Sequence, residues 1–550
     1  MPSVDVLLVH PPAMKPAEPP LGTAVLLSHL RRNGAGAEAI DANLEAYLFL
    51  LEDARLRAAA GDAPSTRVRR AVRNASRALS FLRSSAATES FPRYDSAVRH
   101  LNAALSVHRG PGGTERLTLG DYAHGGFSEF SPADLERIAS GEEETIFSDY
   151  YRDILLPRVE AMRPRNVAIS IHYRHQVLPA FELAGMLRRR LPAARILGGG
   201  GMFTSWRNSL RKAGVRFSPF HAIGFGRGEK ALAEAAAGVL AAGEGYFEGG
   251  EEAEFLPDYR FAPLAEYLSP EPVLPVASSR GCYYRRCAFC PEAVAPVHSY
   301  RESGAASFPS LLRELSLRYG VSRFHLTDDA IPPAILRSMA ERKDLLRGIS
   351  WHGFARFGRE LLDPGFVSEL AEAGCAMLQL GLESGSQALL DRMGKGTRVT
   401  DASAVLSNLS RAGISAYVYV MLGVPWETRD DAVRTLEFLS ERAGRIGFLN
   451  LSILNLPRDA AWEGPPEGRD PGERAISEGD EPLGLYRPVP ARGGWGRAQA
   501  RRFLSKELLG VPAIRAIAGR TPHWFTSSHA VFFRPGPPGR PRRKAPVHGR

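Results

Sequence analysis

The sequence contains little cysteine and no long apolar run. Four cysteines in 550 residues are too few for a disulfide framework. The sequence contains no run of 18 or more apolar residues, so it predicts no helix that crosses a membrane. The N-terminal MPSVDVLLVHPP lacks the basic region and cleavage site of a signal peptide and is typical of a buried strand. We therefore expect a cytoplasmic protein, and 550 residues predict two or three domains.

The sequence also lacks a basic patch within its body, although its formal net charge is +10. Its 70 basic residues are spread among 60 acidic ones, except in the closing RPGPPGRPRRKAPVHGR. Proline, glycine and like charges make such a stretch typical of disorder, so residues 531–550 are predicted to form a disordered basic tail. We expect no nucleic-acid partner.

Three of the four cysteines lie together. Cys282, Cys287 and Cys290 stand in SSRGCYYRRCAFCPEA, directly after an apolar, strand-like run. Three soft thiolates on one loop suit an iron–sulfur cluster that keeps one iron free for a substrate. A structural zinc site is the alternative, with His298 as the nearby histidine. Cys375 lies too far along to be an obvious ligand and is predicted to be a small buried residue.

The first 250 residues predict an α/β domain. VDVLLVHPP, AEAIDAN, NVAISIHY, RILGGGG and FHAIGFG read as strands, and PPLGTAVLLSHLRRNG and QVLPAFELAGMLRRRLP as helices between them. This alternation predicts a doubly wound, Rossmann-like parallel sheet with a ligand at the carboxyl ends of its strands. A helical insertion at about residues 45–160 interrupts the unit, either as a cap over the ligand site or as a surface elaboration.

Residues 265–455 predict a second α/β unit with the cysteines at its head. Its strand candidates are VLPVASS, RFHLTD, ISWHGFAR, AMLQLGLES, AYVYVMLG and GFLNLSIL, separated by helical stretches. Six successive β-α units fit a partial (β/α)6 barrel of the TIM type, whose functional residues gather at the carboxyl ends of the strands. Residues 456–530 predict a small C-terminal cap.

Several motifs resemble the radical S-adenosylmethionine (SAM) superfamily, specifically its branch with an N-terminal cobalamin-binding domain. They are RGCYYRRCAFCPE, GLESGSQALLDRMGKGT, YVMLGVPWETRDDAVRTLEFL and the N-terminal LLVHPP with PPLGTAVLLSHLRRNG. The resemblance covers most of residues 1–455. It departs from the family pattern at one point, because four residues separate Cys282 from Cys287 where three are usual.

The resemblance implies a [4Fe–4S] cluster on Cys282, Cys287 and Cys290, with SAM bound to the free iron and cleaved reductively to a 5′-deoxyadenosyl radical. Flavodoxin or ferredoxin is the implied reductant. The implied SAM-binding residues are Phe289, Asp328, Asp329, Glu383, Ser384, Gly423 and Pro425. Asp328 and Asp329 also fit a helix cap. Arg356 fits either a carboxylate-binding role or an ordinary salt bridge, and His352 fits a packed core histidine.

For cobalamin, the resemblance points to the loops after the N-terminal strands. These are residues 19–22, residues 172–176, the glycines Gly198, Gly199, Gly200 and Gly201, and the segment with Gly226, Gly228 and Glu229. Glycines let a backbone approach a large corrin or its nucleotide tail closely, although they also serve plain turns. The Asp-x-His-x-x-Gly motif is absent, so no histidine of that motif is expected on cobalt.

We interpret the sequence as a cobalamin-dependent radical SAM enzyme that methylates an unactivated carbon of a biosynthetic intermediate. A rearrangement, cyclisation or oxidation without methyl transfer is the alternative, and a non-catalytic metal- or nucleic-acid-binding protein is a remote one. The substrate, a small molecule or a peptide, is not specified by the sequence.

Overall fold

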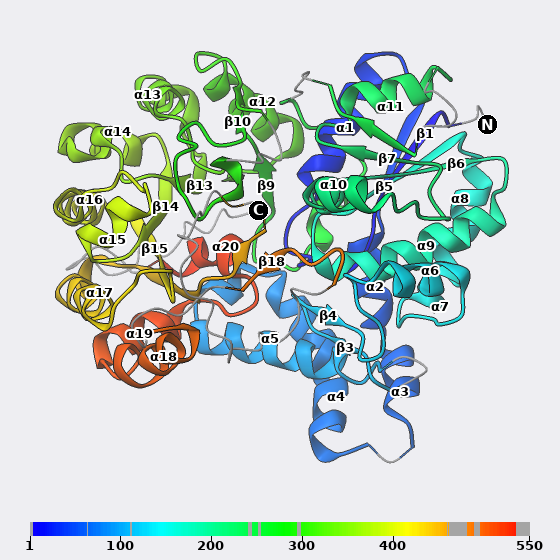
Figure 1. Cartoon of the computed structure of the whole chain (residues 1–550), viewed down its shortest axis with the longest axis horizontal. Helices are drawn as coiled ribbons and strands as arrows, with labels where there is room; N and C mark the ends of the chain where they lie inside the picture. Colours follow the sequence, from blue (N-terminus) through cyan, green and yellow to red (C-terminus); the bar gives the residue numbers. More distant parts are fainter. Residues whose placement is uncertain are drawn as a thin grey trace, which may run out of the picture.

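Two parallel β-sheets lie side by side and form the framework of the chain (Figure 1). The computed structural model describes residues 4–62, 64–109, 113–239, 245–250, 255–293, 299–458, 460, 481–488 and 495–534. Two expectations fall outside these residues. They are His298 as a zinc ligand and the part of the predicted tail beyond residue 534.

The first sheet has six parallel strands in the order β2-β1-β5-β6-β7-β8. The strands are β1 (Val6–His10), β2 (Ala37–Asp41), β5 (Asn166–Ser170), β6 (Arg195–Gly199), β7 (Ala222–Phe225) and β8 (Tyr246–Glu248). Strand order reverses between β1 and β5, which is where doubly wound sheets bind ligands.

Helices cover both faces of this sheet, as a doubly wound fold requires. Helices α1 (Leu21–Arg32) and α11 (Glu229–Ala236) pack on one face, over a small core of mainly Ala and Leu side chains. Helices α9 (Val177–Arg190) and α10 (Gly201–Ala213) pack on the other face, within a larger aromatic and aliphatic core. The predicted Rossmann-like unit is confirmed.

The second sheet is also parallel, and its strands follow one another in chain order, β9-β12-β13-β14-β15-β16. They are β9 (Val273–Val276), β12 (Arg323–Leu326), β13 (Ser350–Ala355), β14 (Cys375–Glu383), β15 (Ser415–Leu422) and β16 (Phe448–Ile453). Helices α12 (Phe308–Tyr319), α13 (Pro333–Glu341), α14 (Pro364–Glu372), α16 (Val399–Ala412) and α17 (Arg429–Glu441) cover the outer face. This sequential, open arrangement is the expected partial barrel.

The helical insertion packs at the opposite end of the barrel from the cysteines. Its helices include α2 (Ala42–Leu50), α3 (Asp53–Ala60), α4 (Thr66–Leu82), α5 (Phe91–Leu105) and α6 (Pro132–Ser140). They share one buried core with Met377, Tyr417 and Phe448, which stand near the starts of their barrel strands. The helices of the insertion therefore close the amino-terminal end of the barrel, while Asp121 and Tyr122 of the same insertion contact His175 in the loop after β5.

The C-terminal helices α18 (Arg497–Phe503) and α19 (Pro512–Arg520) pack against the outer core of the barrel. Beyond them, α20 (Thr526–His529) and a 3-10 turn (Ala530–Phe533) are buried, and the Phe533 ring packs 4.6 Å from Tyr94 of α5. The expectation that the disordered tail begins at residue 531 is wrong at that boundary. Val531, Phe532 and Phe533 are apolar, and burying them against the insertion is favourable.

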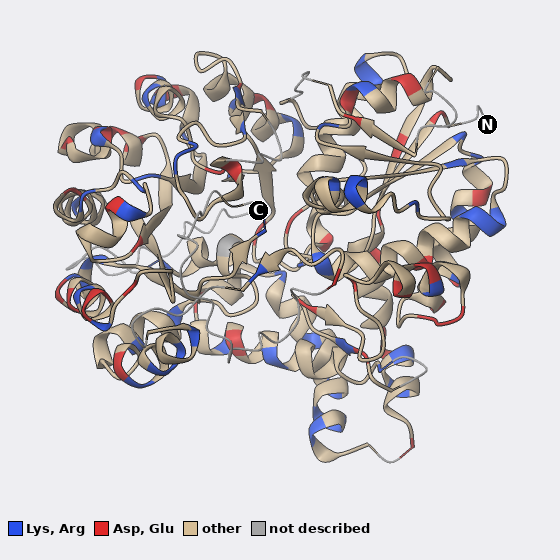
Figure 2. Ribbon diagram, in the orientation of Figure 1, with Lys and Arg blue, Asp and Glu red and all other residues tan. Residues whose placement is uncertain are grey.

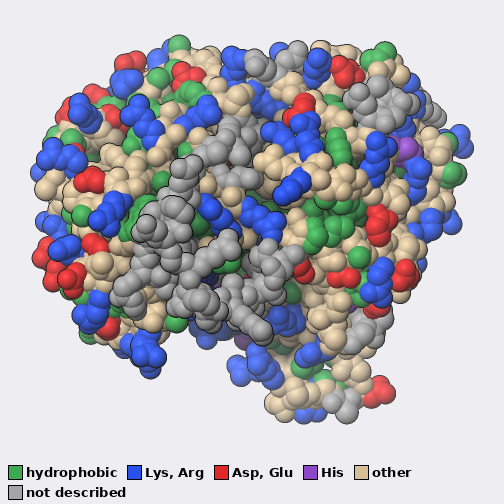
Figure 3. Space-filling model, in the orientation of Figure 1, with side chains coloured by type: hydrophobic (Ala, Val, Ile, Leu, Met, Phe, Trp, Pro, Cys, Tyr) green, Lys and Arg blue, Asp and Glu red, His purple; other side chains and the backbone are tan. Residues whose placement is uncertain are grey.

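Charged side chains of both signs are interspersed over the helices (Figure 2) and over the face shown in Figure 3. This distribution agrees with the spread of basic residues along the sequence. Within the described part of the chain, no helix combines the length and apolar character that crossing a bilayer requires.

Candidate functional site

The three clustered cysteines lie in a loop at the carboxyl edge of the barrel sheet. This cysteine loop, residues 281–293, follows β9 and the short strand β10 (Ser279–Arg280), which pairs with β11 (Arg301–Glu302). None of the three thiols forms a disulfide, and Cys287 is buried while Cys282 and Cys290 are half-buried. Burial, followed by the nearby Cys287 and Cys282 thiols, raises the pKa of Cys290 to about 12. The three thiols therefore share one local environment.

Three cysteines on one loop suit a [4Fe–4S] cluster, which takes its cysteine ligands on different irons, whereas a structural zinc site normally has four ligands around one centre. Among the residues that the structure describes, no group of three Cys, His, Asp or Glu side chains is arranged to hold a single metal ion.

The cysteine loop is held by the segment that follows β14. The Ala288 N–H donates to the Met393 carbonyl (2.9 Å), and the Tyr284 hydroxyl donates to the Gly394 carbonyl (2.9 Å). Gly394 and Gly396 both have positive φ, and a Cβ at Gly396 would stand 2.1 Å from the Tyr284 hydroxyl. The glycines of the MGKG stretch therefore allow the close contact that positions the loop.

Arg356, just beyond the end of β13, braces the same loop. Its Nη1 lies 3.9 Å from the Cys287 Sγ, and its guanidinium carbon lies 3.5 Å from the centre of the Tyr284 ring. Its Nη2 also donates to the Lys395 carbonyl. These contacts go to a thiol, an aromatic ring and a backbone carbonyl, and the carboxylate-binding role stays a prediction. The Arg356 guanidinium therefore contacts both Cys287 and Tyr284 and helps to position the loop.

Glu383 ends β14 and pairs with Lys395, with 2.8 Å between the Glu383 Oε1 and the Lys395 Nζ. Both side chains are largely buried, and Glu383 has a positive φ of 65°. The Lys395 Nζ lies 5.7 Å from the centre of the ring of Phe289, the residue that stands between the last two cysteines in the sequence. This places an ion pair and an aromatic face together beside the cysteine loop, as a ligand with polar and aromatic parts requires.

Asp328 fixes the start of the cysteine loop. Its buried carboxylate accepts hydrogen bonds from the Ser278 N–H (3.1 Å), the Ser278 hydroxyl (2.8 Å) and the Ser279 hydroxyl (2.5 Å). The helix-cap interpretation is wrong for both aspartates, because α13 begins after Pro332 without a side-chain cap. The Asp329 side chain is exposed. The protein around it partly removes water from its carboxyl, and this desolvation, followed by the nearby Asp328 carboxyl, raises the pKa of Asp329. Of the two, only Asp329 is open to a ligand.

Ser384 and Pro425 are buried, and the hydroxyl of Ser384 is already engaged. It lies 3.2 Å from the Thr435 hydroxyl and accepts a hydrogen bond from the Ser386 N–H (3.1 Å). Gly423 has a φ of 73°, and its N–H donates to the Glu427 carboxylate. These residues build the turns after β14 and β15 that lie at the same edge as the cysteine loop.

Glu427 links the turn after β15 to the C-terminal segment. Its Oε2 accepts hydrogen bonds from the Gly423 N–H and from the Trp495 indole (3.1 Å), while its Oε1 is buried with no hydrogen-bond partner among the described residues. Burial raises the pKa of Glu427 to about 7. Sequence reasoning did not single out Glu427, which lies within the motif YVMLGVPWETRDDAVRTLEFL.

Replacing Glu427 with glutamine is expected to stabilise the protein at high pH. The pKa is higher in the folded state than the unfolded value near 4.5, so the stability contribution of Glu427 is complete below pH 4.5 and is lost as pH rises to about 7. The Glu427→Gln variant should therefore gain on the order of 2 kcal/mol over wild type between pH 5 and pH 8.5. Melting curves of both proteins at the two pH values test this. The same difference at both values would show that the carboxyl does not titrate there.

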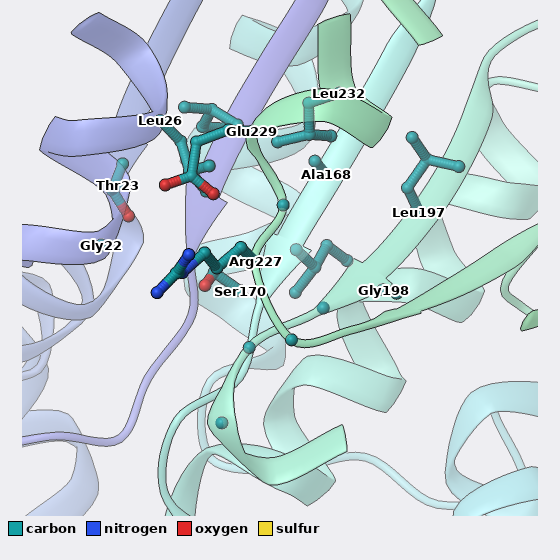
Figure 4. Close-up of a pocket in the computed structure, with 18 of the residues that line it drawn as sticks. Gly22, Thr23, Leu26, Ala168, Ser170, Leu197, Gly198, Arg227, Glu229 and Leu232 are labelled. Carbon is teal, nitrogen blue, oxygen red and sulfur yellow. The ribbon is translucent and has the colours of Figure 1, made fainter. Parts of the chain in front are cut away.

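A second site lies on the first sheet, between α1 and α11 (Figure 4). It is a cavity of about 220 Å³, here called the glycine cavity because eight of its lining residues are glycines. They are Gly22, Gly198, Gly199, Gly200, Gly201, Gly224, Gly226 and Gly228. Strands β1, β5 and β6 supply Leu8, Ala168 and Leu197 to its wall. The predicted cobalamin-binding loops thus contribute to a single cavity.

Two separate structural requirements explain glycines in the run at residues 198–201. A Cβ at Gly198 would stand 2.8 Å from the Phe203 ring, and Gly200 has a φ of 104° with the Ile171 carbonyl 2.4 Å from its Cβ position. By contrast, a Cβ at Gly199 would meet no atom within 4 Å. Gly198 and Gly200 therefore serve packing and the turn, while Gly199 leaves open space in the cavity.

The two sites share a wall. Arg280 stands two residues before Cys282 and also lines the glycine cavity. Arg227, in the loop after β7, lines the cavity and donates from its Nη2 to the Ser299 carbonyl (2.7 Å), just before β11. Arg227 falls inside the predicted segment from Gly226 to Glu229, whereas sequence reasoning assigned no site role to Arg280 or Lys395, because their contacts depend on how distant segments pack.

Comparison with known proteins identifies the part of the chain that carries the cysteine loop. Residues 276–439, from the end of β9 through most of α17, match the Radical SAM superfamily. This match confirms the radical SAM part of the resemblance for residues 276–439, and a [4Fe–4S] cluster and SAM are the cofactors that a radical SAM domain implies.

Two relatives carry methyltransferase names. An uncharacterized methyltransferase of Pyrococcus horikoshii is 26% identical over 214 residues, which are 38% of this chain and 45% of the relative. Bacteriochlorophyllide d C-12(1)-methyltransferase of Chlorobaculum tepidum is 28% identical over 207 residues, which are 36% of this chain and 44% of the relative. The chain thus matches less than half the length of each relative.

Two solved structures share the fold. One is the radical SAM methyltransferase TsrM from Kitasatospora setae, bound to tryptophan and a SAM analogue, with a TM-score of 0.51, 16% identity and coverage of 83% of this chain and 74% of that chain. The other is OxsB, a cobalamin-dependent SAM radical enzyme bound to aqua-cobalamin and SAM, with a TM-score of 0.52, 15% identity and coverage of 82% and 53%. At these identities the likeness establishes the common fold.

Proposed function

We propose that this radical SAM enzyme, whose residues 276–439 belong to that superfamily, uses cobalamin to methylate an unactivated carbon of a biosynthetic intermediate. One observation carries the proposal: Arg280 stands two residues before Cys282 and lines the glycine cavity as well. A cavity on the sheet that would hold the corrinoid therefore adjoins the loop that would hold the cluster. When bound, the cluster and SAM supply a 5′-deoxyadenosyl radical, and cobalamin supplies a methyl group.

The residues at the barrel edge would hold the cluster and SAM. Cys282, Cys287 and Cys290 are the iron ligands, and Arg356 positions Cys287 through the 3.9 Å contact with its sulfur. The Glu383–Lys395 pair beside Phe289 offers a carboxylate and an ammonium to the polar ends of SAM. Asp329, the exposed aspartate, adds a second carboxylate for the amino group.

The glycine cavity would hold part of the corrinoid. Its glycines permit a large flat ligand to approach the backbone closely. Its apolar lining residues, such as Ala168, Leu197 and Leu232, suit the base of the nucleotide tail. Methyltransferase names among the relatives and the bound cobalamin in OxsB support this assignment. An external reductant such as flavodoxin or ferredoxin completes the proposal, and the substrate is a small molecule or peptide.

Labelled SAM tests the proposed function without a known substrate. The protein is reconstituted anaerobically with iron, sulfide, cobalamin and a low-potential reductant, and is then incubated with SAM labelled in its methyl group. We expect 5′-deoxyadenosine among the products and label in the corrinoid fraction, both measured by mass spectrometry. 5′-Deoxyadenosine without label in the corrinoid would favour rearrangement, cyclisation or oxidation. The absence of both products contradicts the proposed function.

A further inference from the structure

An ion pair joins the first sheet to the inside of the barrel. Glu18 lies in the loop of residues 11–20, between β1 and α1, and His325 lies on β12, 307 positions further along the chain. The His325 Nδ1 lies 2.9 Å from one oxygen of the Glu18 carboxylate and 3.2 Å from the other. The Glu18 side chain is 18% exposed and the His325 side chain is 10% exposed, so the pair is largely shielded from water.

A second histidine limits the rotation of the His325 ring. His352 on β13 is the ladder partner of His325, and the two rings stack with their centroids 4.6 Å apart and their planes 8° apart. Side chains alternate along a strand, and the neighbours Phe324 and Leu326 belong to the outer core of the barrel. His325 therefore projects from the inner face of β12, where the loop that carries Glu18 reaches it.

Glu18 favours the charged form of His325. Burial alone would lower the pKa of His325, but the Glu18 carboxylate and its hydrogen bond, followed by the nearby Asp328, outweigh burial and raise that pKa above its ordinary value. The His325 imidazole thus holds its second proton more firmly than a free histidine does. Its Nδ1–H donates a charge-assisted hydrogen bond to Glu18, which is shorter and stronger than a neutral one.

The loop that carries Glu18 is also fixed at several other points. The Met14 N–H donates to the Asn43 Oδ1 (2.7 Å), and the Pro16 carbonyl accepts a hydrogen bond from the Leu268 N–H (2.8 Å). The loop leads directly into α1, whose residue Gly22 lines the glycine cavity. A shift of the loop would therefore shift one wall of the cavity.

His325 stands close to the residue that anchors the cysteine loop. The end of β12 leads to Asp328, whose carboxylate holds Ser278 and Ser279 at the start of that loop. The Glu18–His325 pair thus joins the segment beside the glycine cavity to the strand that anchors the cysteine loop.

Stability is a weak explanation for a shielded ion pair. Removing two charges from water costs about as much free energy as their attraction returns, and the best-attested use of such a pair is to select one geometry. A pair that spans two sheets selects the placement of one sheet relative to the other.

We propose that Glu18 and His325 are positioning residues that set the placement of the glycine cavity relative to the cysteine loop. The inference rests on the proposed function, because this placement matters for the reaction when a methyl group passes from SAM at the cysteine loop to a corrinoid in the glycine cavity. The pair acts through the loop of residues 11–20 and needs no contact with the substrate or a cofactor.

The ratio of two products tests this inference in the reconstituted protein. Transfer of label from methyl-labelled SAM to the corrinoid requires both sheets, whereas 5′-deoxyadenosine formation requires the barrel. We expect Glu18→Ala and His325→Ala each to lower the label in the corrinoid about 10- to 100-fold and to leave 5′-deoxyadenosine formation at the wild-type level. The double variant should lose no more than either single variant, because each substitution already removes the pair. Glu18→Gln keeps an acceptor oxygen without the charge and should recover part of the transfer.

Hydrogen–deuterium exchange of the protein without cofactors gives a second readout. The amides of Ala13 and Met14 are hydrogen-bonded within the protein and report on the loop of residues 11–20. We expect them to exchange faster in Glu18→Ala and in His325→Ala than in the wild type, because the loop loses its attachment to the barrel. The amides of β14 should keep their wild-type rates.

Glu271→Ala is the matched control. Glu271 precedes β9 and pairs with Arg323 at the start of the same strand, β12, with 2.6 Å between the Glu271 Oε2 and the Arg323 Nε. Its loss should change neither the product ratio nor the exchange of residues 11–20. An equal loss of both products in Glu18→Ala, or a wild-type ratio, overturns the positioning role while the proposed function stands. If the wild-type protein transfers no label to the corrinoid, the proposed function itself fails, and the exchange rates still decide whether the pair holds the loop.

Discussion

Replacing Cys287 with alanine is expected to remove the iron–sulfur cluster and reduce 5′-deoxyadenosine formation by at least about 1000-fold, which corresponds to roughly 4 kcal/mol. Cys287 is the buried member of the trio and the one that Arg356 contacts. Three thiolates leave one iron open for SAM, and two thiolates do not retain a stable cluster at this site. Iron and sulfide analysis, the visible absorbance of the cluster and product formation each measure the loss.

Cys375→Ala is the matched control for this experiment. Cys375 is the fourth cysteine, buried at the start of β14, with a pKa that burial raises beyond the usual range for a thiol. Its loss removes one small buried side chain and should leave the iron content and SAM cleavage at wild-type levels. Full iron content and cleavage in Cys287→Ala would falsify the assignment of the cysteine loop.

Replacing Gly199 with leucine is expected to weaken cobalamin binding by at least about 100-fold, or roughly 2.7 kcal/mol. Gly199 ends β6, and its Cβ position faces space with no atom within 4 Å. A Cβ at this position meets no atom of the protein within 4 Å, and a leucine side chain extends from it into volume that the ligand needs. The fold and the cluster should therefore be retained while the corrinoid is excluded.

Gly444→Leu controls for the general effect of a glycine replacement. Gly444 lies in a 3-10 turn (Ala443–Arg445) away from the glycine cavity, and its Cβ position also has no atom within 4 Å. This variant should bind cobalamin as the wild type does. Unchanged cobalamin affinity in Gly199→Leu would show that the corrinoid binds elsewhere, whatever the result for the cluster.

Local patterns in the sequence were enough for the two sheets. Each strand is a short apolar run, and each helix between them has apolar residues at helical spacing, so the alternation alone specifies parallel β-α units. Parallel strands end at one edge, which is why the cysteine loop, Asp329 and Glu383 were predicted near one another. The boundary at residue 531 failed because three apolar residues, Val531, Phe532 and Phe533, precede the basic stretch and are buried.

The helical insertion shows what periodicity leaves open. Helices α4 and α5 agree with the expected helical character of the insertion, but the sequence did not predict which segments they pack against. The Tyr94 hydroxyl lies 2.6 Å from the His529 Nδ1, a contact between residues 435 positions apart. Such a pairing is set by the shape of both surfaces, and neither segment carries a local signal for it.

The sequence by itself determined the fold class, the cysteine trio and the glycine loops, since each depends on residues that are close along the chain. The tertiary structure decided which of those residues act on each other. It paired Glu383 with Lys395, placed Arg356 beside Cys287, engaged the Ser384 hydroxyl within the protein and directed Arg280 to the glycine cavity. These contacts join side chains from different strands and from both sheets, and their distances are fixed only when the complete core packs.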